Sequence, residues 1–315
     1  MERLSPMARE YLTGSLASSF TAAVFNPLEV VKTRLQLQGM PGTPRLYTGG
    51  FVATLRTIAQ QDGLALLWRH GLVTIVGRDF FYSGVRTGMY PTVRSVVSSG
   101  RAAEDVSMVQ KIVAGAICGG VGAGLGNPFD VVRVRMIADG GVIDRSTGKL
   151  ATGFRAGHEP RYRSSLQCFA DARRSEGFLR GLCLRGIVPS MSRAALLTAA
   201  QMSTYDHTKV LAKRHGVLPE GVALHCIAAG ISGFAAQVSC NPADVLKSRV
   251  MSARAGSANG APVTVTSVAV HILRHEGVGA FYKGFAPAYA RLGPTIFVQM
   301  PIVEALRKAM GVRSL

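Results

Sequence analysis

Cysteine and charged residues are both scarce in this sequence, and each scarcity argues against a class of protein. The 5 cysteines form no CxxC pair and no regular spacing, so neither a disulfide scaffold nor a metal site is predicted. Only 17% of the residues are charged, against about 25% in a typical soluble protein. Hydrophobic residues make up 48% and the mean hydropathy is +0.23, a composition that favours a membrane protein.

Acidic residues are also few, since 18 Asp and Glu stand against 36 Lys and Arg, a formal net charge of +18. A basic excess of this size is typical of nucleic-acid-binding proteins. Here, however, the basic residues fall between long apolar stretches, and there is no zinc-finger, RNP or basic-zipper pattern. We therefore expect no nucleic-acid partner, and attribute the charge to anionic lipid and a small anionic solute.

A threefold internal repeat dominates the sequence. Its first element is an apolar stretch followed by Asn, Pro, any residue, an acid, two residues and a base. The copies are NPLEVVKTR, NPFDVVRVR and NPADVLKSR, which begin at Asn26, Asn127 and Asn241. Their prolines lie 101 and 114 residues apart, a spacing that indicates three tandem units. A second element follows each copy, begins with an acid and Gly at Asp62, Glu176 and Glu276, and ends near a base and Gly.

The stretch before each of these prolines is long enough to cross a bilayer, for which about 20 residues suffice. Residues 11–28 and 112–129 carry no formal charge, and residues 222–243 contain only His225. The second apolar segment of each repeat is less apolar, and carries Arg78, Asp79 and Arg86, then Arg193, then Arg291. Charges at membrane depth usually face a bundle interior or an aqueous path. The alternative is a soluble bundle of amphipathic helices.

The three Pro-x-acid-x-x-base motifs and their downstream elements resemble the signature of the mitochondrial carrier family over almost the whole chain. This resemblance implies an all-α membrane protein, in which six transmembrane helices in three pseudosymmetric repeats form a barrel. Three short matrix helices would lie parallel to the membrane, with both termini on the intermembrane side. We place the repeats at residues 1–104, 105–217 and 218–315. Lys and Arg predominate in the segments that would face the matrix, in agreement with the positive-inside tendency.

The acid and base of each motif lie three residues apart and share a helix face, so three converging helices can pair them between neighbours. The resemblance implies that these residues close the matrix side, with one bracing glutamine. This matrix gate comprises Glu29, Lys32, Gln36, Asp130, Arg133, Asp244 and Lys247. The alternative is that they are static helix-end charges.

The opposite, cytoplasmic gate is predicted to be weaker. The family pattern of aromatic, acid, two residues and base is complete in the second repeat alone, and Pro91 takes the place of an acid in the first. The gate residues on this side would be Arg94, Asp206, Lys209, Glu304 and Arg307.

The substrate site is predicted between the gates. Counting back 13 residues from the acid position of each second helix gives Arg78, Arg193 and Arg291, and counting back five gives Arg86, Gln201 and Gln299. With Tyr90, these residues form the candidate substrate site. Arginine suits a carboxylate because its planar fork binds both oxygens.

The segments around Arg86 and Arg193 resemble most the oxoglutarate and dicarboxylate carriers and the related uncoupling proteins, whereas the RRRMMM hexamer of adenine-nucleotide carriers is absent. Asp79 stands where this subgroup usually has glutamine. We expect an exchanger of dicarboxylates or keto acids, with a proton or anion leak as the alternative. No catalytic group is predicted, so the chain is not expected to be an enzyme.

The remaining expectations concern surroundings rather than chemistry. The N-terminus lacks a signal-peptide apolar core, so targeting information is expected to be internal. We expect a monomer in the mitochondrial inner membrane, with the peroxisomal membrane left open. No cofactor is expected beyond bound cardiolipin at the matrix-helix ends. His271 and His275, four residues apart, are interpreted as part of a solvated helix face, because two ligands do not make a zinc site.

Overall fold

The computed structural model describes residues 6–41, 43–69, 71–98, 108–214, 222–253 and 264–310. Within these ranges the chain is helical, and extended pairing is limited to one isolated bridge between Ile143 and Leu150. The first repeat contains α1 (Pro6–Val24), α2 (Asn26–Leu37), α3 (Gly50–Gln61), α4 (Leu64–Arg69) and α5 (Leu72–Val97). The second contains α6 (Met108–Asp139), α7 (Ser165–Glu176), the π-helix η1 (Phe178–Cys183) and α8 (Ile187–Arg214). The third contains α9 (Val222–Ser252), α10 (Val265–His275), the 3₁₀ helix η2 (Val278–Tyr282) and α11 (Phe285–Ala309).

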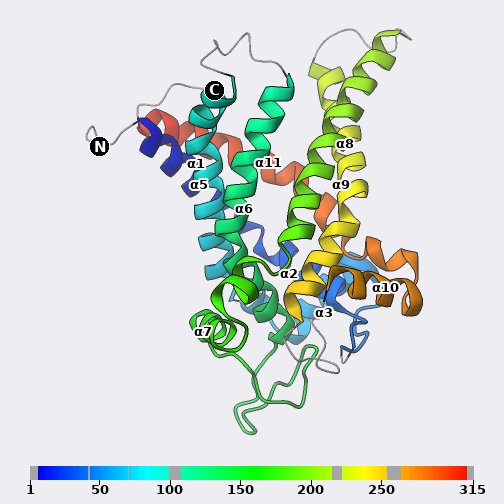
Figure 1. Ribbon diagram of the computed structural model, residues 1–315. Coiled ribbons are helices and arrows are strands. Elements are labelled where there is room, and N and C mark those ends of the chain that lie inside the picture. Colours follow the sequence, from blue (N-terminus) through cyan, green and yellow to red (C-terminus); the bar gives the residue numbers. More distant parts are fainter. Residues whose placement is uncertain are drawn as a thin grey trace.

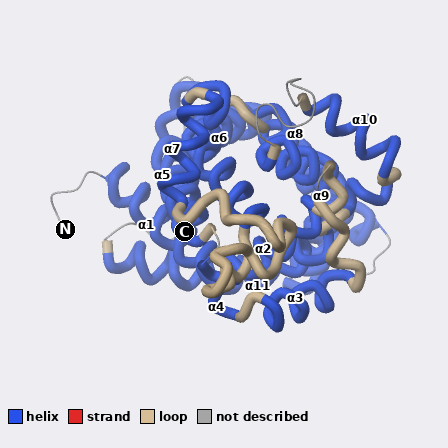
Figure 2. The backbone as a smooth tube through the Cα atoms, turned by 90° about the horizontal axis from the view of Figure 1, so that it is seen from below, coloured by secondary structure: helices blue, strands red, loops and turns tan. Residues whose placement is uncertain are grey.

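The long helices form a closed ring, as the view along their axes shows (Figure 2). Helix α1 packs on α5, α5 on α6, α6 on α8, α8 on α9, α9 on α11, and α11 returns to α1. Small side chains allow the close approaches, since a Cβ at Gly122 of α6 would lie 3.1 Å from the carbonyl oxygen of Tyr82 on α5. The short helices α3, α7 and α10 lie together at one end of the ring (Figure 1), which we call the motif end.

Proline interrupts the first helix of every repeat at this end. In the first repeat the helix breaks at Phe25, and Pro27 stands in the first turn of α2, where its missing N–H costs nothing. Pro128 and Pro242 lie inside α6 and α9, which continue past them as single helices. A proline inside a helix removes one backbone hydrogen bond and bends the axis.

The final glycine of each downstream element has a backbone reason. Helices α5 and α11 start immediately after Gly71 and Gly284, whose φ angles are 78° and 80°. Other residues adopt this left-handed conformation only at a cost. At Gly284 a side chain would also meet the carbonyl oxygen of Lys32 at 3.1 Å, so glycine is required there twice over.

The segment between α6 and α7, residues 140–164, is expected from its polar, Gly-rich sequence to be a mobile loop. The structure instead folds it against the motif end. Phe154 and Tyr162 are buried in the main apolar cluster, where Phe154 packs edge-to-face on Tyr47 of the first repeat. The carboxylate of Asp139 accepts hydrogen bonds from the backbone N–H groups of Arg161 and Tyr162. The loop therefore joins the second repeat to the first.

Hydropathy alone singles out no helix of the described chain as long and apolar enough to cross a membrane. Apolar side chains nevertheless remain uncovered on the long helices. On α6 they recur every four residues and thus lie along one face: Val113, Ile117, Val121 and Leu125.

Candidate functional site

Three ion pairs join the long helices where the repeated motifs meet. The Nζ atom of Lys32 lies 2.8 Å from Asp244. The Nζ atom of Lys247 lies 2.7 Å from Asp130. The third pair, between Arg133 and Glu29, measures 3.2 Å. Each base therefore reaches the acid of the preceding repeat in a closed cycle, and all six residues are largely buried.

The three symmetry-related arginines bind the same acids. Arg193 on α8 lies 2.5 Å from Asp244. Arg291 on α11 lies 3.0 Å from Glu29. Arg78 on α5 lies 3.3 Å from Asp130. In every case one carboxylate oxygen binds the motif base and the other binds the arginine. The predicted substrate arginines and matrix gate are thus one connected cluster, which we call the gate cluster.

The gate cluster also contains Asp79, which pairs with the adjacent Arg78. The guanidinium of Arg78 lies 4.9 Å from the centroid of the Tyr82 ring, a cation–π distance. The described cluster thus holds six cationic and four anionic side chains, a formal excess of two positive charges. The side chains of Arg78, Arg193 and Arg291 remain 27%, 31% and 30% exposed, so a solute can reach them.

A second layer of charge lies beneath the gate cluster. Its arginines are Arg34, Arg135 and Arg249, two residues after each motif base. Arg34 lies 2.6 Å from Asp62 and Arg135 lies 2.8 Å from Glu176. Arg249 pairs with Glu276 in the same way. Sequence reasoning missed these pairs, although the strict recurrence of a second base and of an acid before Gly could have indicated them.

Each arginine of this second layer also donates to backbone carbonyls of the next repeat. Arg34 donates to Gly140, Arg135 to Met251, and Arg249 to Gln36 and Gln38. The backbone of one repeat is therefore fixed by a fully charged side chain of another. Such charge-assisted bonds are about twice as strong as neutral ones.

Glu276 is the acid of the second layer whose titration carries a clear physical signature. Burial opposes ionisation of its carboxyl, but hydrogen bonds from Arg249 and Lys283 outweigh burial and lower its pKa below the ordinary value. The ionised carboxylate is therefore a structural component of the third repeat.

The asparagine before each proline was noted in the sequence without a role, and the structure supplies one. Asn26 donates its side-chain amide to the carbonyls of Leu67 and Trp68. Asn127 and Asn241 make the corresponding bonds to the ends of η1 and η2. The amide thereby ties each proline bend to the short element that follows it in its own repeat.

The remaining predicted substrate residues are less constrained. Gln299 donates to the hydroxyl of Ser18 across the α11–α1 contact at 3.1 Å. Gln201 is exposed on α8 and Tyr90 is half-buried on α5. Arg86 belongs to α5, but its side chain lies outside the described residues. The amide nitrogen of Gln36, the predicted brace, is buried without a hydrogen-bond partner, and its bracing role stays a prediction.

The opposite end contrasts with the motif end. Arg94 and Glu304 make no ion pair with any part of the chain that the structure describes. Arg307 has a partner, whereas the side chains of Asp206 and Lys209 lie outside the described residues. The structure therefore presents a conformation in which the motif end is closed by ion pairs.

A surface pocket of about 530 Å³ lies between the first and third repeats at the motif end. Its walls include Tyr47, Thr48 and Gly50 before and at the start of α3, and Lys283 and Gly284 before α11. Two helix N-termini and a lysine in one pocket favour a phosphate group. The pocket brings together the aromatic and basic segments from which a lipid site was predicted.

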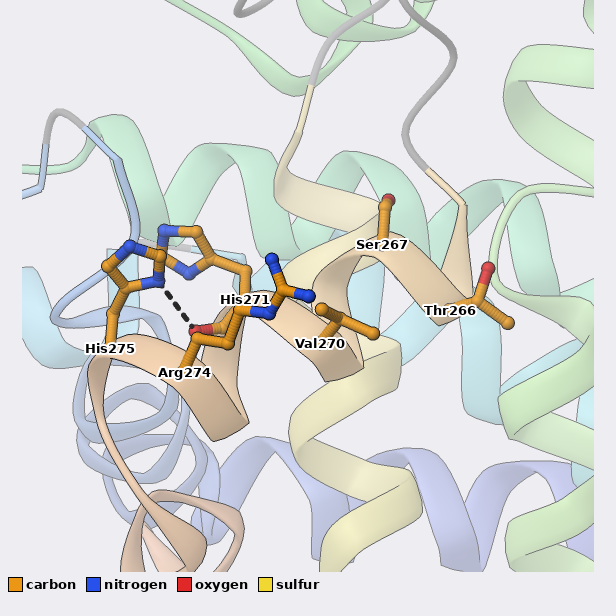
Figure 3. Close-up of a pocket in the computed structure, with 6 residues that line it drawn as sticks. All are labelled: Thr266, Ser267, Val270, His271, Arg274 and His275. Atoms are coloured by element: carbon orange, nitrogen blue, oxygen red, sulfur yellow. Dashed lines mark hydrogen bonds between the residues drawn. The ribbon is translucent and has the colours of Figure 1, made fainter.

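A second pocket runs along α10 (Figure 3), where His271 and His275 stack with ring centroids 4.5 Å apart. Nδ1 of His275 lies 3.2 Å from the carbonyl oxygen of His271. Thr266, Ser267 and Arg274 complete the polar lining, all on the same helix. Among the described residues, no group of three or more potential metal ligands is found here or elsewhere.

Comparison with known proteins gives a single answer. The family model described as mitochondrial carrier protein matches residues 4–101, 104–216 and 219–314. Mitochondrial uncoupling protein 1 of Arabidopsis thaliana is 33% identical over 298 residues, covering 92% of this chain and 91% of the relative. The mitochondrial 2-oxoglutarate/malate carrier protein of Homo sapiens is 31% identical over 307 residues, covering 98% and 92%. Mitochondrial brown fat uncoupling protein 1 of Rattus norvegicus is 30% identical over 285 residues, covering 90% and 86%.

Proposed function

This chain belongs to the mitochondrial carrier protein family, and from that premise we propose that it exchanges dicarboxylates or keto acids across the mitochondrial inner membrane. The solute class is that of 2-oxoglutarate, malate and oxaloacetate. Transport is the whole of the proposed activity, and it requires no catalytic residue. The observation that carries the proposal is the binding of Arg78, Arg193 and Arg291 to the three gate acids.

The proposed mechanism follows from sharing each acid between two bases. An anionic solute that binds the partly exposed arginines competes with Asp130, Asp244 and Glu29 for the same guanidinium groups. Each gate acid then keeps only its motif base, so the ion pairs that close the motif end weaken. Solute binding and gate opening are thereby coupled, as alternating access requires. Without solute the arginines return to the acids and the gate stays closed, which favours strict exchange over a leak.

The charge of the gate cluster supports a dianionic solute. Its formal excess of two positive charges is neutralised by two carboxylates, and a guanidinium can bind each carboxylate through two hydrogen bonds. A neutral solute would leave that excess uncompensated in a partly buried site. A monoanion would leave half of it.

Membrane embedding is part of the proposal. The exposed apolar stripe on α6 is the kind of surface that a soluble monomer covers, and lipid would cover it here. The motif end would then face the matrix and the opposite end the intermembrane space. The pocket between Tyr47 and Lys283 would hold a phosphate of cardiolipin, the anionic lipid we expect as a bound partner. The carrier itself is proposed to act as a monomer.

A second candidate is a regulated proton or anion leak, and the uncoupling proteins among the relatives favour it. Liposome transport separates the two functions. The purified protein is reconstituted into liposomes with or without internal malate, and uptake of labelled 2-oxoglutarate is followed. An exchanger takes up label only against internal malate. Uptake that is equally fast from empty liposomes, or a proton current without solute, would favour the leak.

A further inference from the structure

The three arginines of the gate cluster occupy equivalent positions but have different surroundings. Within the described residues, Arg193 and Arg291 each make one ion pair, with a gate acid of the next repeat. Arg78 makes two, with Asp130 and Asp79, and also lies over the ring of Tyr82. The first repeat therefore holds its arginine by three groups, where the other repeats use one.

The difference originates in a single position of the sequence. Asp79 follows Arg78, whereas Ala194 follows Arg193 and Leu292 follows Arg291. The distance from the guanidinium to the gate acid responds accordingly. It is 3.3 Å for Arg78, but 2.5 Å for Arg193 and 3.0 Å for Arg291. Asp79 thus shares a guanidinium that would otherwise belong to the gate acid or to the solute.

We propose that Asp79 sets the charge of the solute that the site accepts. This inference rests on the proposed function, in which the solute draws the arginines away from the gate acids. When that happens, Arg193 and Arg291 lose their only ion-pair partners and face the solute with full charge. Arg78 keeps Asp79 and stays neutralised. Two uncompensated guanidiniums select a dianion, and a third would admit a trianion.

The proposal differs from a merely structural role for the Arg78–Asp79 pair. A structural pair keeps α5 in shape, so its loss would reduce transport of every anion by the same factor. A charge-setting residue changes the balance between anions, because removing its negative charge stabilises a bound trianion more than a bound dianion. The ratio of two specificity constants therefore separates these roles.

The test uses succinate as the dianion and tricarballylate as the trianion. Homo-exchange of each is measured in liposomes for the wild type, Asp79→Asn, Asp79→Glu and the control Glu159→Gln. Glu159 is exposed in the loop before α7, so its variant removes the same charge far from the gate cluster. We expect Asp79→Asn to raise the tricarballylate-to-succinate ratio of kcat/KM by about tenfold, which corresponds to about 1.4 kcal/mol. Asp79→Glu and Glu159→Gln should keep the wild-type ratio.

An unchanged ratio in an active Asp79→Asn variant would overturn the inference and leave the proposed function intact. If the wild type exchanges neither anion, the proposed function itself fails. Should Asp79→Asn bind without turning over, the same ratio is read from the thermal stabilisation that each anion gives the detergent-solubilised protein. Equal loss of stabilisation by both anions would assign Asp79 a structural role.

Discussion

Lys32 and Asp244 are 212 residues apart in the sequence and 2.8 Å apart in the structure. The pair joins the first repeat to the third, so it forms only when the two ends of the chain close the ring. Asp244 also binds Arg193 of the second repeat. One carboxylate therefore reports on the arrangement of all three repeats, and the gate cannot open at this interface without changing the site where solute is proposed to bind.

Arg193→Ala should abolish exchange while the protein stays folded. The substitution removes a solute ligand and leaves Asp244 with Lys32 alone. We expect kcat/KM to fall by about 100-fold or more, equivalent to about 2.7 kcal/mol, as for loss of one partner of a shielded charge pair. Uptake of labelled 2-oxoglutarate into malate-loaded liposomes measures it. Arg173→Ala, on the exposed side of α7, is the matched control, and near-normal uptake by Arg193→Ala would refute the site assignment. Arg86→Ala and Arg291→Ala should behave like Arg193→Ala.

Cardiolipin should raise the melting temperature of delipidated protein, because its phosphate would join the first and third repeats at the pocket between α3 and α11. Lys283→Gln should reduce this rise by removing a positive charge from the pocket wall. Arg274→Gln removes an equivalent charge from exposed α10 outside that pocket and should keep the rise. Differential scanning fluorimetry with and without added cardiolipin measures each effect. A wild-type melting temperature that is insensitive to cardiolipin would disprove the lipid site.

Glu276→Gln should destabilise the protein by about 3–5 kcal/mol, because Arg249 is left as a buried charge without its partner. The wild type should also lose stability in acid. Since the pKa of Glu276 is lower in the folded state, the unfolded state binds the proton more readily. The contribution is complete above the ordinary glutamate pKa of about 4.3 and disappears as the pH falls through the folded pKa.

Thermal melts of both proteins between about pH 6 and about pH 3 test this linkage. The difference in melting temperature should shrink as the pH falls. A difference that stays constant over this range would show that ionisation of Glu276 does not stabilise the fold.

Pro91→Glu should favour the state closed at the opposite end. Pro91 belongs to α5 and takes the place of an acid present as Asp206 and Glu304 in the other repeats. A glutamate there gains a base on a neighbouring helix and restores a backbone N–H. A stabilisation of about 1.4 kcal/mol would shift the two open states about tenfold.

The readout is labelling of a single introduced cysteine near Arg193 by an impermeant thiol reagent, in a background without the native cysteines. Labelling from the intermembrane side should slow in Pro91→Glu, and Pro91→Ala should not slow it. Labelling that is unchanged or faster in Pro91→Glu would mean that the proline has another role.

The repeated motifs allowed much of the site to be predicted. Three copies of one pattern require three equivalent positions around an axis, so Arg78, Arg193 and Arg291 fall at one level. Acid and base three residues apart predict pairing between neighbours, and all three pairs are present. The prediction separated these pairs from the arginines, whereas the structure joins them, because spacing along a chain does not say which two oxygens of a carboxylate are occupied.

Residues 140–164 illustrate the opposite limit. Gly and polar side chains dominate the segment, and local propensity therefore predicts a mobile loop. Its order comes from Phe154 and Tyr162, which are buried against residues of another repeat, and from backbone donors to Asp139. Contacts of this kind depend on the closed ring and leave no local pattern.

The gate cluster has a consequence for how such a chain can be assembled. Every gate acid takes its two cations from the two other repeats, and none from its own. A single repeat carries an acid, a motif base and an arginine, yet cannot neutralise itself. Its surfaces are complementary head to tail, and such heterologous contacts close into a ring when the rotation between units is a third of a turn. Three separate copies of one repeat would satisfy the same contacts as a cyclic trimer. A chimera that exchanges one repeat must therefore match both of its new neighbours, because the compatibility of each unit is recorded in the other two.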